Sequence, residues 1–337
     1  MPLETLTRTM IPAIEAELRQ VVHQVIDDGL QELHTMLAYH LGWEGEGAGP
    51  EATGKRIRPL LVLLAAASAG GDWKKALPAA ASVELVHNFS LIHDDIEDNS
   101  PLRRGRPTVW KKWGIPQAIN AGDAMLTLAH IALLRLEDTT DPQITLQASR
   151  LLQETCLQLT QGQYLDISYE NRKDLPLDSY WPMVAGKTAA LLSACTKMGA
   201  VIAGRNPEIC DAYGDFGTYL GFAFQAQDDL LGIWGDAALT GKSSESDLVS
   251  GKKSLPVLYG LSHNGRFAAR WRQGPIPGSE VKELADILEA EGGRSFTQDA
   301  AEKLTDQALK ALENAKPGGK SGEALKDLAL RLLGRRG

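Results

Sequence analysis

The chain has 337 residues, of which 43% are hydrophobic and 23% are charged, and its formal net charge at pH 7 is −8. This length is enough for one large domain or two ordinary ones. The acidic balance argues against a nucleic-acid-binding protein, for which a basic face would be expected.

The cysteines and the hydropathy pattern indicate the compartment. Cys156, Cys195 and Cys210 lie in mainly apolar segments without the spacing of metal ligands, which favours buried thiols in a reducing compartment. Residues 1–20 lack the basic start and continuous apolar core of a signal peptide. The longest apolar run, residues 60–67, is too short to span a bilayer. We therefore expect a cytoplasmic protein that is not integral to a membrane.

The first part of the chain combines a helical pattern with a basic segment. Residues 4–41 show apolar residues at helical spacing, including Leu30, and are expected to form packing surface. A Gly-rich break at 42–54 precedes Pro59 and three cations, Lys55, Arg56 and Arg58. Proline is tolerated in the first turn of a helix, so the cations are expected at a helix N-terminus. The dipole there favours anions, and cations at that end therefore indicate an anionic ligand, although ordinary first-turn residues are the alternative.

The next predicted helix ends in an acidic cluster. Apolar residues between 85 and 92 predict a buried helix that residues 99–101 terminate. Asp94 and Asp98 lie four residues apart, which places them about 6 Å apart on one face, with Asp95 beside them. Carboxylates at a helix C-terminus repel one another and oppose the helix dipole unless a cation lies between them. Mg²⁺ commonly binds through one or two carboxylates plus substrate phosphates.

Basic residues follow the acidic cluster closely. Arg103, Arg104 and Arg106 carry guanidinium groups that match phosphate oxygens. Acids for a metal and arginines for an anion together predict a magnesium–diphosphate site. The same stretch taken alone is also typical of a solvated surface, so both interpretations stay open at this point. His87 lies two turns before Asp94 on nearly the same face, although a single histidine in an apolar helix usually belongs to the core.

Two polar residues interrupt an apolar segment further along the chain. Lys187 and Thr188 follow Gly186 in a Gly-Lys-Thr triplet. A phosphate-binding P-loop is excluded because its earlier glycine and preceding strand are missing. Gly186 is expected to loosen or kink the helix and to turn both polar groups toward a cavity. A lysine that reaches out to solvent is the alternative.

A second acidic cluster repeats the chemistry of the first. Gln225, Asp228 and Asp229 are the polar residues of an apolar segment, and a loop rich in Gly, Ser and Lys is expected over residues 236–254. That loop carries Lys242 and Lys252. Alternating strand patterns are absent along the chain, which makes an all-α fold the expectation.

Seven motifs follow one another in a fixed order. They are GKRIRP at 54–59, VELVHNFSLIHDDIED at 83–98, LRRGRPT at 102–108, GKTA at 186–189, FQAQDD at 224–229, TGK at 240–242 and GKKSLP at 251–256. The series resembles the trans-isoprenyl diphosphate synthases, the polyprenyl synthetase family, over residues 40–265 and is closest to the geranylgeranyl type. The resemblance implies a chain-elongating prenyltransferase that condenses isopentenyl diphosphate with dimethylallyl, geranyl or farnesyl diphosphate. It also implies a homodimer, each chain forming one all-α bundle over residues 1–337 around a deep central cavity.

The resemblance implies roles for individual residues. Mg²⁺ ions, or Mn²⁺ in their place, would be held by Asp94, Asp98 and Asp228. The allylic diphosphate would be bound by Arg103, Lys187, Thr188, Gln225, Lys242 and Lys252. Isopentenyl diphosphate would be bound by Lys55, Arg58, His87 and Arg104. Catalysis would depend on Asp94, Asp95, Asp98, Lys187, Asp228 and Lys242.

The second motif departs from the family pattern, which is often DDxxD. Gly232 stands at the position of the third acid. We expect Asp228 to be the ligand that matters there, and whether Asp229 or Asp236 compensates for Gly232 is open.

Product length would depend on the residues one turn before the first motif, because the hydrocarbon tail in this family descends along that helix. Phe89 and Ser90 give one aromatic and one small residue at these positions. This pair resembles the geranylgeranyl type and implies a C20 product, with C15 or C25 as alternatives.

Three other functions remain as alternatives. A terpene cyclase of related fold handles one diphosphate and has no need for the separate set that would bind isopentenyl diphosphate. A non-catalytic subunit of a heteromeric synthase would be expected to lose acids or lysines that this chain keeps. A helical interaction protein explains none of the ordered motifs.

Overall fold

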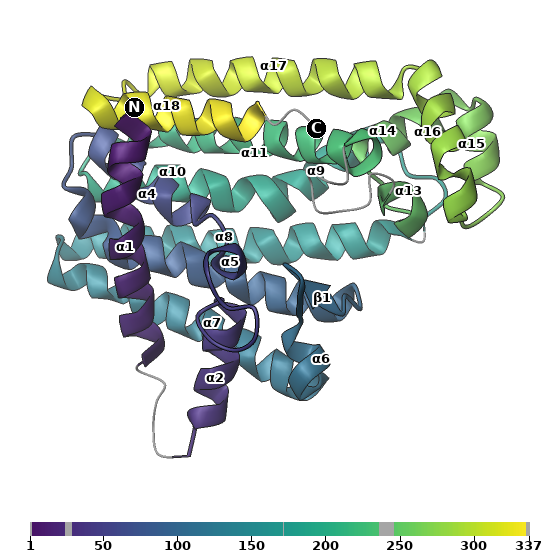
Figure 1. Ribbon diagram of the computed structural model, residues 1–337. Helices are drawn as coiled ribbons and strands as arrows, with labels where there is room; N and C mark the ends of the chain where they lie inside the picture. Colours follow the sequence, from purple (N-terminus) through teal and green to yellow (C-terminus); the bar gives the residue numbers. More distant parts are fainter. Residues whose placement is uncertain (1, 24–28, 171, 236–245, 335–337) are drawn as a thin grey trace. The chain divides into compact units, whose positions relative to one another are not determined.

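The computed structural model describes residues 2–23, 29–170, 172–235 and 246–334 (Figure 1). Within these ranges nearly all of the regular structure is helical, which confirms the predicted all-α class. No helix in the described part is long and apolar enough to cross a membrane. Asp236 and Lys242, which the sequence placed near the second acidic motif, lie outside the described residues.

The chain forms two compact units that interleave along the sequence. The first comprises Met1–Gln153, Cys195–Cys210 and Pro317–Leu325, and the second comprises Glu154–Ala194, Asp211–Lys316 and Lys326–Gly337. Neither unit is a single continuous segment. The expectation of one domain over residues 1–337 stays a prediction.

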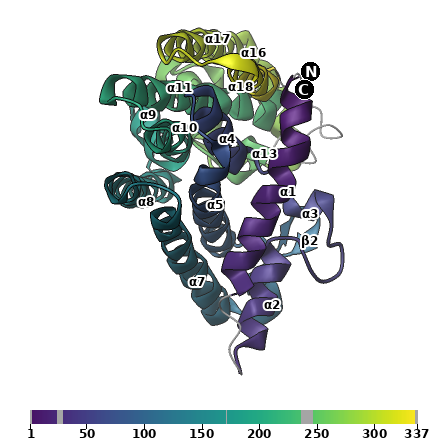
Figure 2. The ribbon, with the colours of Figure 1, turned by 90° about the vertical axis from the view of Figure 1, so that its left-hand side faces the viewer.

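The first unit is built around one long helix, α5 (Leu77–Glu97), which begins with Pro78 in its first turn. Helices α1 (Pro2–His23), α4 (Ile57–Ser68) and α7 (Ile115–Leu134) pack against α5 (Figures 1 and 2). Shorter helices complete this part of the chain: α2 (Gln31–His40), α3 (Pro50–Thr53), η1 (Trp73–Ala76), α6 (Val109–Trp113) and η2 (Arg135–Asp138).

The predicted apolar stripe of residues 4–41 is buried along α1. Met10, Ile14 and Leu18 have no exposed surface. Leu30, which lies before α2, is 47% exposed, so the prediction is wrong there. Leu30 directly precedes the first residue of α2, Gln31.

A two-residue hairpin connects α5 to α6. Strands β1 (Leu102–Arg103) and β2 (Arg106–Pro107) pair antiparallel. The two residues between them, Arg104 and Gly105, have φ angles of 52° and 75°. Positive φ at both central positions is the geometry of a type I′ turn, which suits the twist of a hairpin but is uncommon for arginine.

The second unit contains the remaining helices. They are the later part of α8 (Pro142–Glu170), η3 (Leu177–Ser179), α9 (Tyr180–Val184), η4 (Ala185–Ala189), the start of α10 (Ala190–Ile202), α11 (Pro207–Trp234) after its first turn, α13 (Ser246–Ser250), α14 (Leu255–His263), α15 (Arg266–Trp271), η5 (Gly278–Glu280), α16 (Val281–Ala290), α17 (Gly293–Asn314) and the second half of α18 (Gly319–Leu333). Its core includes Tyr180, Val184, Leu255 and Leu258. Helix α14 packs against α17 (Figure 1).

The backbone of the second unit can be compared with two of the sequence predictions. The segment η4 around Gly186 is a turn of π-helix, so the predicted loosening of the helix is confirmed. A side-chain carbon on Gly162 would lie 2.8 Å from the Cα of Gly186, so the two backbones are in close contact. The predicted loop over 236–254 is corrected in part, because residues 246–250 form α13.

Candidate active site

The two adjacent aspartates of the first acidic motif, Asp94 and Asp95, have different surroundings. Asp94 is half-buried and Asp98 is exposed at the end of α5. Asp95 is 1% exposed, and its Oδ1 accepts a 2.8 Å hydrogen bond from Nε of Arg103 and forms an ion pair with Nη2 at 2.8 Å. Burial raises the pKa of Asp95, and the Arg103 guanidinium opposes this rise. Asp95 therefore anchors the hairpin to the helix, while Asp94 and Asp98 present the more accessible carboxylates.

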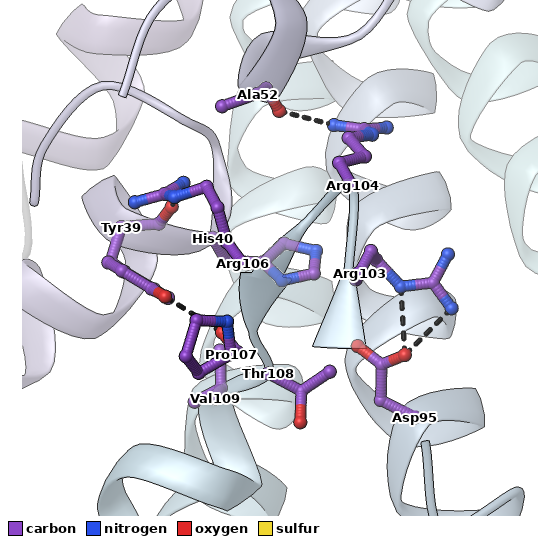
Figure 3. A pocket seen from close by; sticks show the side chains of 10 residues that line it. All are labelled: Tyr39, His40, Ala52, Asp95, Arg103, Arg104, Arg106, Pro107, Thr108 and Val109. Atoms are coloured by element: carbon purple, nitrogen blue, oxygen red, sulfur yellow. Dashed lines mark hydrogen bonds and ion pairs between the residues drawn. The ribbon is translucent and has the colours of Figure 1, made fainter. Parts of the chain in front are cut away.

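The hairpin directs Arg104 away from Arg103 (Figure 3). Its Nη1 donates a 2.7 Å hydrogen bond to the carbonyl of Ala52. A side-chain carbon on Gly54 would lie 2.9 Å from the Arg104 guanidinium carbon, and Gly54 has a φ of 76°. Only glycine fits this position without strain. The GKRIRP and LRRGRPT motifs are thereby held together in the first unit.

Arg58 and His87 form a second basic pair in the same unit. The Arg58 Nη1 lies 3.2 Å from Nε2 of His87. A guanidinium can only donate, so Nε2 of His87 is the unprotonated acceptor. Burial and the positive charges of Arg58 and Arg104 hold the pKa of His87 well below its usual value. Burial also lowers the pKa of Arg58 and that of Arg104.

Two other arginines of the basic motifs have structural roles. Arg56 is 3% exposed and pairs with Glu15 at 2.6 Å and Glu84 at 2.8 Å. Arg106 donates to the carbonyls of Tyr39, Glu44 and Glu46. Arg56 and Arg106, which belong to neither predicted substrate-binding set, are thus bound by protein groups, whereas Lys55 is exposed.

His40, which no local sequence pattern marks, lines a small pocket with Arg103 and Arg104 (Figure 3). Burial and the surrounding arginines lower the pKa of His40 to about 3. Its Nε2 is buried and accepts or donates no hydrogen bond within the described residues. The side chain reaches the basic motifs only through tertiary folding, so the local sequence carries no signal for it.

The second acidic motif, on α11, repeats the division of the first. Asp228 is half-buried, whereas Asp229 is 1% exposed. Asp229 accepts hydrogen bonds from the Tyr180 hydroxyl at 2.8 Å, from Gln225 Nε2 at 2.9 Å and from the Leu255 backbone N–H at 2.8 Å. Burial raises the pKa of Asp229, and these donors oppose the rise. Asp229 ties α11 to α9 and to the GKKSLP motif, which leaves Asp228 as the accessible member.

The GKTA motif joins the same network in the second unit. The Thr188 hydroxyl donates a 2.8 Å hydrogen bond to Gln225 Oε1. Lys187 forms an ion pair with Asp166 of α8. Both side chains therefore have polar partners in the second unit, Asp166 for Lys187 and Gln225 for Thr188.

Lys252 lies among carboxylates. Burial by itself would lower the pKa of its ammonium, but the negative charges of Asp229, Asp247, Asp228 and Asp166 raise it above its ordinary value. The structure thus brings Lys187, Thr188, Gln225, Asp228 and Lys252 into one part of the second unit.

The donor set fits a divalent ion that a diphosphate helps to bind. Within the described ranges, no group of three His, Cys, Asp or Glu side chains is placed to hold a metal alone. Asp94 and Asp98 offer hard oxygen ligands one helical turn apart. Mg²⁺ keeps several waters and binds through few carboxylates together with phosphates, so these carboxylates are compatible with it.

The two predicted chain-length residues lie in the first unit on α5. Phe89 and Ser90 are both half-buried. The Phe89 ring packs edge-on against His93 with 5.1 Å between ring centroids. His93 in turn contacts Gly122 of α7, where a side-chain carbon would clash with the imidazole. The Phe89 ring therefore packs against His93, which lies between α5 and α7.

Comparison with known proteins gives consistent similarities. The family model described as "Polyprenyl synthetase" matches residues 49–287. The chain is 39% identical to a (2E,6E)-farnesyl diphosphate synthase of Mycobacterium tuberculosis over 98% of this chain and 95% of that protein. It is also 39% identical to a geranylgeranyl diphosphate synthase of the same species over 92% of this chain and 90% of that protein.

Solved structures agree in fold. A polyprenyl synthetase from Streptomyces coelicolor A3(2) has a TM-score of 0.86 and 35% identity over 98% of both chains. A geranylgeranyl pyrophosphate synthase from Corynebacterium glutamicum, solved with isoprenyl diphosphate and magnesium, has a TM-score of 0.85 and 26% identity over 99% of both chains.

Proposed function

Since the chain belongs to the polyprenyl synthetase family and is therefore a prenyltransferase, we propose that it condenses isopentenyl diphosphate with a short allylic diphosphate in a Mg²⁺-dependent reaction. The product is a trans-polyprenyl diphosphate, in the first place geranylgeranyl diphosphate. The allylic starter is dimethylallyl, geranyl or farnesyl diphosphate.

One observation supports a two-substrate enzyme above all. Within the described residues, no carboxylate forms an ion pair with the half-buried Arg58 or with the exposed Arg104, and His87 beside Arg58 is neutral. Cations that lie close together without an ion-pair partner favour an anionic ligand. A second, separate set around Lys187 and Lys252 accompanies Asp228. A cyclase that handles one diphosphate has no use for both sets.

The roles of the residues follow from these two sets. Lys55, Arg58, His87 and Arg104 bind the diphosphate of isopentenyl diphosphate. The allylic diphosphate is bound by Arg103, Lys187, Thr188, Gln225, Lys242 and Lys252. Asp94, Asp98 and Asp228 hold the divalent ions, which supply charge neutralisation for the departing diphosphate. Asp95 and Asp229 fix the hairpin and the GKKSLP segment in place.

The reaction needs no protein nucleophile. The bond between the allylic carbon and the diphosphate oxygen breaks, and the bonding pair leaves with the diphosphate. Basic side chains stabilise that developing charge. The double bond of isopentenyl diphosphate then attacks the allylic cation, and a proton passes from the new carbon chain to the released diphosphate.

Product length rests on Phe89 and Ser90. Phe89 is supported by His93, and Ser90 leaves room beside it, which favours a C20 product. A C15 product has support of the same weight from the relatives, because one relative at 39% identity is named a farnesyl diphosphate synthase. The two outcomes differ by one condensation.

Assembly and compartment complete the proposal. Helix α7 carries exposed apolar side chains at Ile115, Ile119, Ile131 and Leu134, which a homodimer would cover. Three free cysteines accord with a reducing compartment such as the cytoplasm. Light scattering on the purified protein measures the dimer directly.

Substrate dependence tests the function. Labelled isopentenyl diphosphate should enter an extractable prenyl product only when an allylic diphosphate and Mg²⁺ are both present. Release of diphosphate from the allylic substrate alone, with formation of a hydrocarbon, would instead indicate a cyclase.

A further inference from the structure

The position of the missing third acid is occupied by another carboxylate. A side-chain carbon built on Gly232 would lie 2.7 Å from Cγ and 3.0 Å from Oδ1 of Asp247. These distances are shorter than ordinary van der Waals contact. A side chain at position 232 and the Asp247 carboxylate therefore cannot both be accommodated as the structure stands.

The helix geometry relates Asp247 to Asp228. Asp228 and Gly232 are four residues apart on α11, so they lie on the same face, one turn from each other. The Asp247 carboxylate comes from α13, is 8% exposed as a residue and lies against Gly232 on that face. It thus occupies the place that the side chain of a third acid in a DDxxD motif would take.

Lys252 provides an independent sign that these acids form one cluster. The charges of Asp229, Asp247 and Asp228 all raise the pKa of the Lys252 ammonium. The backbone N–H of Lys252 also donates a 3.0 Å hydrogen bond to the carbonyl of Asp247. A turn of chain thereby keeps the Asp247 carboxylate and the Lys252 ammonium beside Asp228.

Asp229 and Asp236, the two other acids that could replace the third acid of the motif, are less suited to that role. Asp229 is buried, and its carboxylate already accepts three hydrogen bonds. Asp236 lies outside the described residues. Asp247, in contrast, lies within the described residues, and its carboxylate contacts the face of α11 at Gly232.

We propose that Asp247 replaces the third acid of the second aspartate motif and acts with Asp228 on the metal–diphosphate group of the allylic substrate. The inference rests on the proposed function, because it assigns a residue to that same site. Gly232 is then a requirement of the arrangement: it leaves the space that a carboxylate from α13 fills. The acid that completes the motif lies 15 positions after Gly232 in the sequence.

Metal binding tests this assignment without a prenyl transfer step. Mn²⁺ binding in the presence of inorganic diphosphate is measured by calorimetry on the full chain. Loss of one charged interaction corresponds to about a tenfold to hundredfold weaker Mn²⁺ affinity for Asp247→Asn. Asp286→Asn, on the exposed face of α16, is the matched control and should bind as the unmodified protein does.

A compensating pair of substitutions sharpens the test. Gly232→Asp alone should lower the melting temperature, because two carboxylates then compete for one space. The double variant Gly232→Asp/Asp247→Ala should recover Mn²⁺ affinity to within about threefold of the unmodified protein, since the acid returns to α11. Failure of this recovery in a folded double variant would contradict the proposal.

The Lys252→Met variant distinguishes a purely structural role of Asp247 from a role in metal binding. If Asp247 served only as a counter-ion for Lys252, adding Asp247→Asn to Lys252→Met would have no further effect on Mn²⁺ affinity. The proposal predicts a further loss. Unmodified protein that binds no Mn²⁺ with diphosphate would overturn the proposed function itself, whereas unchanged binding by a folded Asp247→Asn variant would overturn only the role of Asp247.

Discussion

One carboxylate oxygen of Asp95, Oδ1, accepts a 2.8 Å hydrogen bond from Nε of Arg103 and lies 2.8 Å from Nη2 of the same guanidinium. The second aspartate of each pair is thus buried and committed to protein donors, since Asp229 is held in the same way by Tyr180, Gln225 and Leu255. The first aspartate of each pair is left accessible. Substitution of the accessible aspartate and substitution of the buried one should therefore have different effects on activity and stability.

Asp94 and Asp98 should matter for turnover and little for stability. Asp94→Asn or Asp98→Asn is expected to lower kcat/KM by about a hundredfold or more, because charge that stabilises the departing diphosphate is lost. Asp95→Asn should instead lower the free energy of unfolding by about 1.5–3 kcal/mol through its bond to Arg103. Steady-state kinetics and urea denaturation on the same preparations measure both. An Asp94→Asn variant of full activity would contradict the assignment.

The two basic sets should separate the two substrates. Arg58→Ala is expected to raise the KM for isopentenyl diphosphate, and Lys187→Ala the KM for the allylic substrate. Each loss of a charged hydrogen bond is worth about 1.5–3 kcal/mol, or about ten- to 150-fold. Arg8→Ala, an exposed arginine on α1, serves as control. Equal effects of Arg58→Ala and Lys187→Ala on both substrates would argue for a single anion site.

Acid should destabilise the protein through His40 and His87, which are half-buried. The pKa of His40 is lowered to about 3 and that of His87 lies well below its usual value, chiefly because of desolvation. Unfolded imidazoles bind protons below about pH 6.5 while the folded ones do not, so stability falls as the pH drops from about 6.5. The slope is up to about 1.4 kcal/mol per pH unit for each imidazole.

Denaturation at several pH values between 7.5 and 5 tests this. His40→Gln should flatten the dependence of the free energy of unfolding on pH. An unaltered slope in a folded His40→Gln variant would show that His40 titrates normally.

Product length should respond to the pair at the turn before the first motif. Phe89→Ala removes the ring that His93 supports and is expected to lengthen the product beyond C20. Ser90→Phe should shorten it toward C15, because it adds bulk on the same helix. Chromatography of the dephosphorylated products reports both. If Phe89→Ala leaves the distribution unchanged, the length is set elsewhere in the protein.

Local signals predicted the helices and the motifs well. The apolar stripe before Asp94 and the stop at residues 99–101 are encoded within a few residues, and α5 ends as expected at Glu97. Gly186 likewise marked the π-turn. These features depend on periodicity and on single residues with unusual backbone preferences, which a sequence displays directly.

Long-range pairing explains what the sequence alone did not reveal. Arg56 looked like an anion-binding residue because its partners, Glu15 and Glu84, are 41 and 28 positions away. The same holds for His40, which meets Arg104 only after folding. Asp247 was overlooked because its relation to Gly232 depends on how α13 packs against α11.

The most direct test of the central claim is incubation of the purified protein with Mg²⁺, isopentenyl diphosphate and, in turn, dimethylallyl, geranyl and farnesyl diphosphate, followed by sizing of the prenyl products. Chain elongation that ends mainly at geranylgeranyl diphosphate from every starter is the expected result, with no product when EDTA removes the metal. Absence of any elongated product from all three starters, with a folded protein and Mg²⁺ present, would contradict the account.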